Sequence, residues 1–341
     1  MSTPDPRINF IVQAESDARL QELCHMNVDR DWSSLSDGEN TWSLQTFHRL
    51  REAGRDPTCS RHLLPDRINF AHAAYLRAID TPRDAFVVCL QADFPRVPWA
   101  DLRVVQNQCQ VRGDAARWIP HWPQPGLVAR KPNRTTVHCV AHAGRSWMLA
   151  GTRASWDEAL RKIGCEFKHL GPEKWNDLSE VDVLLAIRSF DRRIYKTKPP
   201  SKLLNAWIAG IPLVAGHDSA FSQIGTPGKD YFRVASLVEA CDAIRHLKED
   251  PSLYRDMVER GRKRAEEYSK DRIVERWIHF IDSQVIPRYE HWLNGGRTRG
   301  LLWECRVVRA RVSRLIQGKL RKFSQAVMGK ETVNRIRLRF R

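Results

Sequence analysis

Residues Lys198–Gly216 read KPPSKLLNAWIAGIPLVAG and indicate a basic loop, a short helix and an apolar strand. The apolar residues of the central part recur at three- and four-residue spacing: Leu203, Leu204, Trp207 and Ile208. This spacing predicts a helix over Ser201–Ala209 that packs one side on a sheet, with prolines before it and Gly210 at its end. The apolar run Ile211–Ala215 is typical of a strand in a parallel sheet covered on both faces.

The start of this helix is suited to binding an anion. The first N–H groups of a helix have no acceptor within the helix, and the helix dipole places positive potential there. Lys198 and Lys202 add two cations at the same place. The segment therefore predicts a site for a phosphate-bearing ligand such as a diphosphate. The alternative is that the lysines only solvate the helix end and the rest is core.

The length and composition favour two α/β domains in a chain that stays in the cytoplasm. The chain has 341 residues, of which 42% are hydrophobic, and this is long for a single core. Its apolar runs are too short for a membrane span, and its start lacks the layout of a signal peptide. The eight cysteines form no CxxC pair, which predicts reduced thiols without a disulfide framework or a zinc site.

The positive charge is concentrated at the end of the chain. Residues 297–341 hold 14 of the 56 Lys and Arg but only Glu304 and Glu331 of the 40 acidic residues, so they carry +12 of the net +16. Apolar residues recur among these cations at helical spacing, which predicts a basic amphipathic helix. We expect it to bind an anionic membrane surface. Nucleic acid and simple docking on the protein body are the alternatives.

The first part of the chain interleaves apolar runs with helical patterns. The predicted strands and helical stretches are Arg7–Val12, Trp42–Ala53, Arg67–Leu76, Ala85–Leu90 and Leu102–Val105. The polar residues QAESD follow the first strand as a loop. Four prolines between Trp118 and Asn133 argue for an extended connection, where we place the domain boundary.

The second part alternates strands and helices more regularly. The predicted strands are Thr135–Val140, Cys165–His169, Val181–Ile187, Ile211–Ala215 and Tyr231–Val234. The predicted helices other than Ser201–Ala209 are Ser155–Ile163, one from the cap at Ser236 to Lys248, Leu253–Tyr268 and Arg272–Trp292. This alternation favours a parallel sheet wound with helices.

The stretch KPPSKLLNAWIAGIPLVAGHDSAF resembles the donor domain of GT-B glycosyltransferases of the family-four type, in particular a bacterial subgroup with the run KPxxKLxNAWxAGxP. HWPQPGLVAR and VDVLLAIR are similar to the same subgroup. The resemblance implies two facing Rossmann-like domains, residues 1–128 for the acceptor and 129–290 for the nucleotide-sugar, followed by the helical tail 291–341. The wider family keeps two glutamates where this sequence has Thr197 and Asn205.

Transfer of a sugar from such a donor leaves negative charge on a diphosphate, and cations can stabilise that charge without a metal. Lys198, Lys202 and Arg188 are the predicted catalytic cations, and Arg145 is a further phosphate contact. Each follows or adjoins the carboxyl end of a predicted strand, where open α/β sheets bind ligands. The nucleotide-sugar is a co-substrate. We expect no cofactor and no metal, because the histidines, cysteines and acids show no metal-ligand spacing.

Further candidates lie around this centre. His217, Asp218 and Ser219 follow the strand Ile211–Ala215 and are expected to contact phosphate or sugar, or simply to cap a helix. Asn205 is expected to bind a ribose hydroxyl. On the acceptor side the candidates are Glu15 and His121, and a general base could be Glu15, Asp17 or Asp93.

The leading hypothesis is a peripheral membrane glycosyltransferase at the inner face of the membrane, which acts on a lipid-linked or cell-surface glycan in polysaccharide biosynthesis. One alternative is a sugar-nucleotide epimerase or phosphorylase of the same fold, which would share the diphosphate site. The other is a basic nucleic-acid-binding protein with a Rossmann-like body. The sequence leaves the donor, the acceptor and the stereochemical outcome open.

Overall fold

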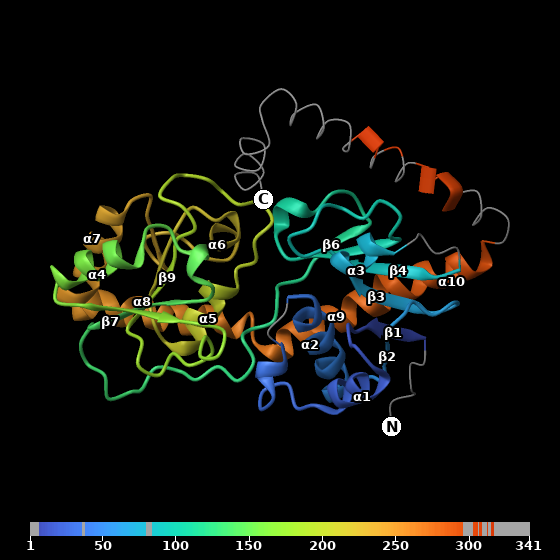
Figure 1. Ribbon diagram of the computed structural model, residues 1–341, viewed down its shortest axis with the longest axis horizontal. Coiled ribbons are helices and arrows are strands. Elements are labelled where there is room, and N and C mark those ends of the chain that lie inside the picture. Colours follow the sequence, from blue (N-terminus) through green and yellow to red (C-terminus); the bar gives the residue numbers. More distant parts are fainter. Residues whose placement is uncertain are drawn as a thin grey trace.

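The computed structural model describes residues 7–35, 38–79 and 84–295, together with a few positions between 303 and 316. The chain forms two parallel β-sheets with helices packed against them, and Figure 1 shows the two units side by side. The predicted α/β class with two Rossmann-like units is confirmed. Most of the predicted basic tail, residues 297–341, lies outside the described residues.

The first sheet has six strands in the order β2-β1-β3-β4-β5-β6. Its strands are β1 (Ile8–Ile11), β2 (Thr58–Ser60), β3 (Ile68–His72), β4 (Phe86–Leu90), β5 (Leu102–Val105) and β6 (Ala116–Trp118). The helical elements around it are α1 (Asp17–His25), η1 (Trp32–Leu35), α2 (Gly38–Glu52), α3 (Ala73–Ala78) and η2 (Gln108–Gln110). The edge strands β2 and β6 were not predicted, because three residues are too few to show a period.

The second sheet has five strands in the order β11-β10-β9-β7-β8. Its strands are β7 (Cys139–Ala143), β8 (Glu166–Leu170), β9 (Val183–Ala186), β10 (Leu213–Ala215) and β11 (Phe232–Arg233). Its helical elements are η3 (Ser146–Met148), α4 (Arg153–Arg161), α5 (Ser201–Ala209), α6 (Ser219–Ile224), α7 (Leu237–Glu249) and α8 (Pro251–Glu266). The predicted bounds of α5 are confirmed, with Gly210 as its left-handed C-cap at φ 69°.

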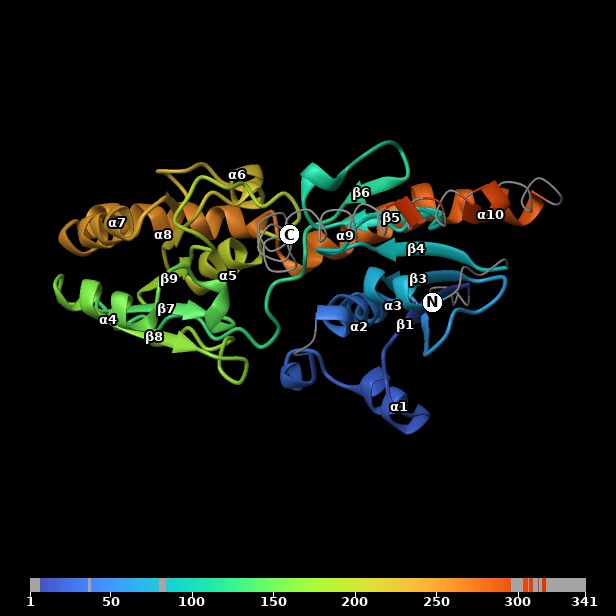
Figure 2. The same cartoon turned by 45° about the horizontal axis from the view of Figure 1, so that its top comes forward.

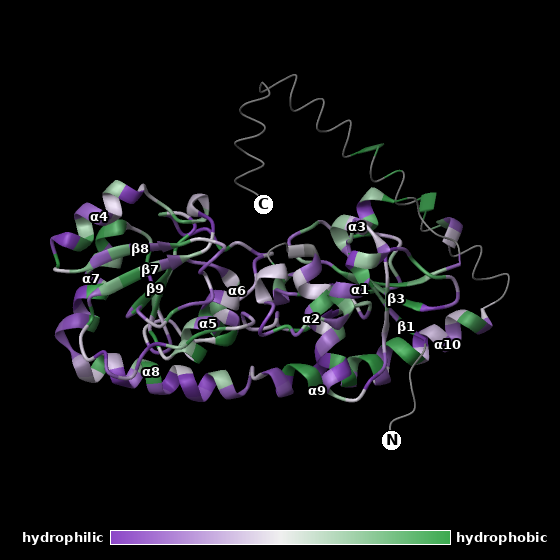
Figure 3. Cartoon of the chain, turned by 60° about the horizontal axis from the view of Figure 1, so that its bottom comes forward, coloured by the Kyte–Doolittle hydropathy of each residue, from purple (hydrophilic) through white to green (hydrophobic). Residues whose placement is uncertain are grey.

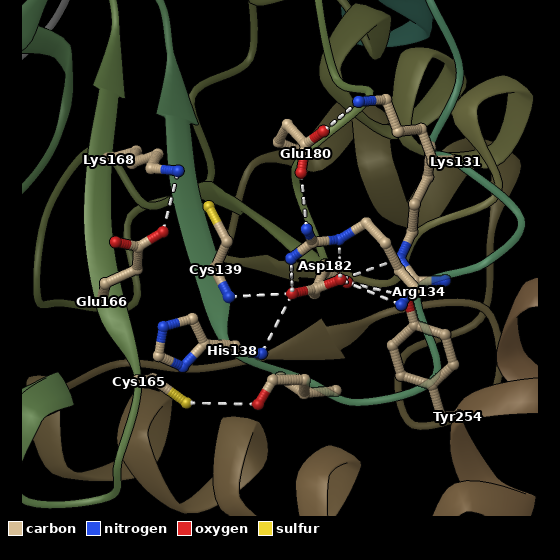
Figure 4. Close-up of polar contacts among 12 residues, drawn as sticks. Lys131, Arg134, His138, Cys139, Cys165, Glu166, Lys168, Glu180, Asp182 and Tyr254 are labelled. Carbon is tan, nitrogen blue, oxygen red and sulfur yellow. Dashed lines mark hydrogen bonds and ion pairs between the residues drawn. The ribbon is translucent and has the colours of Figure 1, made fainter.

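Strand β7 begins at Cys139 and not at the predicted Thr135, and Asp182 explains the difference. Its carboxylate accepts hydrogen bonds from the backbone N–H groups of His138 and Cys139 at 2.9 and 2.8 Å. Arg134 donates to both oxygens of the same carboxylate, as Figure 4 shows. The N–H groups that would extend the strand are thus bound to a side chain at the amino-terminal edge of the sheet.

The closing helices return to the first sheet. α9 (Lys270–Phe280), the π-helical turn η4 (Ile281–Val285) and α10 (Ile286–Asn294) follow α8, and Figure 2 shows α8, α9 and α10 passing along both units. Ile273, Trp277 and Phe280 are buried in the core of the first sheet. Figure 3 accordingly shows more hydrophobic residues along α9 than along α8. The prediction placed the closing helices with the second domain, and of these α9 and α10 pack on the first sheet.

Helix α5 is held between its sheet and α8. Trp207 of α5 is buried and its indole N–H donates to the carbonyl of Asp230 at 3.1 Å. A Cβ added at Gly261 of α8 would lie 2.6 Å from the Trp207 ring, so glycine permits the close approach of the two helices. This packing places the start of α5 at the carboxyl edge of the sheet.

Two further findings concern the cysteines and the search for membrane-spanning helices. Cys24 and Cys59 form a disulfide, which corrects the prediction of reduced thiols for this pair. The pairing depends on α1 lying beside β2, which the 35-residue separation in sequence does not reveal. No helix within the described residues is both long and apolar enough to cross a membrane.

Candidate functional site

The carboxyl ends of β7, β9 and β10 lie at one edge of the second sheet, because neighbouring strands are parallel. The segments that follow these strands carry most of the predicted donor contacts. Arg145 follows β7, Arg188 follows β9, and His217 follows β10. Helix α5 begins at the same edge and brings Lys202 to the end of β7.

Lys202 is a partly buried cation of this group. Its ammonium donates a hydrogen bond to the carbonyl of Ala143, the last residue of β7. Burial, followed by repulsion from Arg188, lowers the pKa of Lys202 from 10.5 to about 8. No described carboxylate forms an ion pair with it. The close approach needs a glycine, because a Cβ at Gly144 would lie 3.0 Å from the Lys202 nitrogen.

Arg188 is paired with Asp218, and both side chains are largely buried. The Arg188 Nε donates to Asp218 Oδ2 at 2.7 Å. The other carboxylate oxygen is buried without a hydrogen-bond partner. Burial raises the pKa of Asp218, although the positive charge of Arg188 acts in the opposite direction. Asp218 stands at the N-cap of α6 but makes no side-chain cap, so the capping alternative is wrong for this residue.

Lys198 lies where the two domains meet. Its ammonium forms an ion pair with Asp93, which follows β4 of the first domain. Asp93 also accepts a hydrogen bond at 2.7 Å from Gln106, and Gln106 donates to the carbonyl of Thr197 at 2.9 Å. A carboxylate of the first domain therefore holds Lys198, and an amide of the first domain holds the residue before it.

The remaining cations lie toward the outside. Arg145 is exposed and forms no ion pair with a described residue. His217 is partly exposed, and burial followed by repulsion from Arg233 lowers its pKa. Ser219 is buried, and its hydroxyl accepts a hydrogen bond from Asn107 of the first domain at 2.8 Å.

Two of the three remaining candidates make other contacts in this structure, and the third is exposed. The side-chain oxygen of Asn205 accepts a hydrogen bond from the backbone N–H of Gln124 at 3.0 Å, which ties α5 to the interdomain connection. His121 stacks on Trp42 with ring centroids 5.3 Å apart, and burial lowers its pKa. Glu15 is exposed beyond β1. Among the described residues, none of these three side chains forms a hydrogen bond or ion pair with Lys198, Lys202 or Arg188.

Sequence reasoning missed two buried amides, Gln106 and Asn107. They follow β5 directly and are 3% and 0% exposed. The signal was the polar run QNQ after the apolar strand LRVV, because polar residues at the carboxyl end of a parallel strand are ligand or interface candidates. Within the described residues, no group of three His, Cys, Asp or Glu side chains could hold a metal ion.

The assembled site is a cluster of cations that has fewer carboxylates than positive charges. Lys202 and Arg188 repel each other, and Asp218 is the one buried acid beside them among the described residues. The N–H groups at the start of α5 add positive potential at the same edge. A bound anion with several oxygens would relieve this repulsion, so the site is suited to phosphate groups.

Comparison with known proteins agrees with this chemistry. Residues 130–279 match the family described as glycosyl transferase-like. This confirms the resemblance to glycosyltransferases for the second domain, while the family-four subgroup stays a prediction. None of the curated proteins matches the sequence.

Several solved structures are similar to the chain. TarM from S. aureus is 12% identical, with 70% of this chain and 58% of that chain covered and a TM-score of 0.46. HepE from Anabaena, solved with UDP and glucose, is 11% identical over 81% of this chain and 99% of that chain, with a TM-score of 0.49. Sucrose-phosphate synthase from Thermosynechococcus elongatus is 12% identical over 64% of this chain and 74% of that chain, with a TM-score of 0.49. The chain thus spans a little over half of TarM.

Proposed function

We propose that this chain is a glycosyltransferase that transfers a sugar from a nucleotide-sugar donor, and the premise is the family match of residues 130–279. The observation that carries the proposal is the partly buried Lys202, which lies beside Arg188 without a carboxylate of its own at the carboxyl edge of the second sheet. A diphosphate provides the negative charge that this cluster lacks.

The reaction breaks the bond between the anomeric carbon and the donor diphosphate while the acceptor hydroxyl forms a new bond to that carbon. Negative charge grows on the leaving oxygens. Lys202, Lys198 and the start of α5 would stabilise it, and one preorganised donor of this kind is worth about 3–4 kcal/mol. Arg188 would bind the same oxygens and keep Asp218 in place. We propose that these groups act without a bound metal.

The acceptor side is proposed more broadly. The first domain would bind a lipid-linked or cell-surface glycan, as expected for polysaccharide biosynthesis. The basic segment 297–341 would hold the protein at the inner face of an anionic membrane. Asp93 lies at the donor site and is a candidate to receive the acceptor's proton if the reaction inverts configuration.

A thermal-shift screen against nucleoside diphosphates and nucleotide-sugars tests the donor site. UDP is the first probe, because HepE was solved with it. UDP should stabilise the protein, and Lys202→Ala should abolish most of the shift. Lys229→Ala is the matched control, since that lysine is exposed and lies outside the site. Failure of every nucleotide to stabilise the wild-type protein contradicts the proposal.

Two further measurements separate the alternatives. A sugar-nucleotide epimerase or phosphorylase would convert its donor without a glycan acceptor, which product analysis with the donor alone detects. Removal of residues 297–341 should release the protein from vesicles that contain phosphatidylserine while leaving UDP binding intact. If the same truncation instead abolishes tight, salt-sensitive binding of nucleic acid, the tail serves that partner.

A further inference from the structure

Asn107 of the first domain contacts two separate segments of the donor site. Its side-chain nitrogen donates to the carbonyl of Lys198 at 2.9 Å and to the hydroxyl of Ser219 at 2.8 Å. Lys198 belongs to the loop before α5, and Ser219 is the first residue of α6. One amide from the first domain thus bridges the two segments.

The hydrogen-bonding capacity of this side chain is fully used. Its oxygen accepts from the backbone N–H of Cys109 at 3.0 Å and from the side chain of Gln223 at 2.9 Å. An asparagine amide has two donor hydrogens and two acceptor lone pairs, so all four are engaged. Asn107 is completely buried. A buried and fully satisfied network of this kind holds its members in one arrangement.

Gln106 and Gln108, on either side of Asn107, also form hydrogen bonds to the second domain. Gln106 binds the carbonyl of Thr197, one residue before Lys198, at 2.9 Å. The backbone N–H of Gln108 donates to the side chain of Gln223 on α6 at 2.9 Å. The three successive residues Gln106–Gln108 therefore contact both α6 and the loop of residues 197–200 before α5, which we call the lysine loop.

We propose that Asn107 is a positioning residue: it holds the Lys198 loop and the start of α6 at the spacing that a bound diphosphate requires, and so assembles the donor site only while the two domains are in contact. The inference rests on the proposed function for its ligand. Opening of the interface would separate Asn107 from both segments, so nucleotide release and domain opening would be coupled.

The test compares three variants of the full chain. Asn107→Asp keeps the shape and the acceptor oxygens but removes both donations, and Asn107→Ala removes the side chain. Gln223→Ala is the matched control, because it removes the bond that Gln223 donates to the Asn107 oxygen and the bond that it accepts from Gln108, but leaves both donations of Asn107 in place. UDP affinity is measured by calorimetry, and amide hydrogen exchange is measured without ligand.

Both Asn107 variants should bind UDP at least about tenfold more weakly, and Gln223→Ala should stay within about twofold of wild type. Exchange at residues 196–203 should quicken in the Asn107 variants and not in Gln223→Ala. Because Asn107 acts through Lys198, adding Asn107→Ala to Lys198→Ala should weaken binding by less than about threefold further.

Any of three results overturns the inference. The first is wild-type UDP affinity in both Asn107 variants, and the second is unchanged exchange at residues 196–203. Equal losses in Gln223→Ala and Asn107→Ala would reduce Asn107 to a general interface contact and also overturn it. If the wild-type protein binds no nucleotide, the proposed function fails, and the ligand-free exchange measurement still decides whether Asn107 positions the loop.

Discussion

Lys198 and Asp93 form an ion pair across the two domains, so the Lys198 ammonium, a proposed phosphate contact, already has a carboxylate partner in the ligand-free protein. The carboxylate side chain is 40% exposed and the lysine side chain 19%, so the pair lies at an accessible boundary. Binding of a diphosphate would exchange one anion for another at Lys198. Under the proposed function, the first domain would compete with the ligand for a cation of the second.

The first prediction concerns this competition. Asp93→Asn should tighten UDP binding about three- to fivefold, since a partly exposed ion pair contributes up to about 1 kcal/mol and that contribution would no longer oppose the ligand. Calorimetric titration measures the change. Asp282→Asn is the control, because Asp282 pairs with Arg55 away from the lysine loop. Weaker binding in Asp93→Asn would show that the carboxylate supports the ligand and does not compete with it.

The second prediction is a pH dependence of nucleotide binding. The pKa of Lys202 is lowered to about 8, so its ammonium loses its proton above that pH in the free protein. UDP affinity should be level below pH 8 and fall above it by up to about tenfold per pH unit. Lys202→Met should bind weakly and lose this slope.

Stability of the nucleotide-free protein should change in the opposite direction. The unfolded chain holds the Lys202 proton up to pH about 10.5, so between about 8 and 10.5 the unfolded state binds more protons and the folded state gains stability as pH rises. Urea midpoints of wild type and Lys202→Met across this range isolate the contribution of Lys202. Parallel curves for the two proteins would contradict the lowered pKa.

The third prediction tests the packing that places α5. Gly261→Ala inserts a methyl group 2.6 Å from the Trp207 ring and should cost about 1–3 kcal/mol of unfolding free energy. Chemical denaturation measures it. Gly38→Ala is a suitable comparison, because nothing lies within 4 Å of the added carbon, and its effect should stay below about 1 kcal/mol.

The fourth prediction concerns Asp182, at the amino-terminal edge of the second sheet. Its buried carboxylate is bound by Arg130, Arg134 and two backbone N–H groups, so Asp182→Asn should destabilise the protein by about 3 kcal/mol. Glu180→Gln should cost less than about 1 kcal/mol, because that carboxylate is half exposed. Equal losses in denaturation experiments would assign no special role to the buried charge.

Acid should reproduce part of this loss. Burial of Asp182 would by itself raise its pKa, but the hydrogen bonds from Arg134 and the backbone outweigh burial and lower the pKa to about 2. The stabilisation is present above the ordinary value of 3.8 and is lost as pH falls through about 2. The difference in unfolding free energy between wild type and Asp182→Asn should therefore shrink over this range.

Local patterns predicted much of the second sheet. The helix Ser201–Ala209 has its predicted bounds, because its apolar spacing, its prolines and Gly210 are all local signals. Strands β9 and β10 are apolar runs, so the sequence predicts them without knowledge of the strands they pair with. The start of β7 was misplaced, since Asp182 lies more than 40 residues away and its bonds to His138 and Cys139 have no trace in the local sequence.

The sequence by itself determined that a helix with Lys198 and Lys202 at its start follows a parallel strand, because helix and strand periods are local properties. That this helix start binds phosphate stays a prediction from the chemistry of its orphan N–H groups. Only the tertiary structure decided which charges these lysines meet. Asp93, Gln106 and Asn107 reach the lysine loop from about 90 residues away, across a domain interface. Such pairings depend on how two separately folded sheets are docked, and no local pattern encodes that geometry.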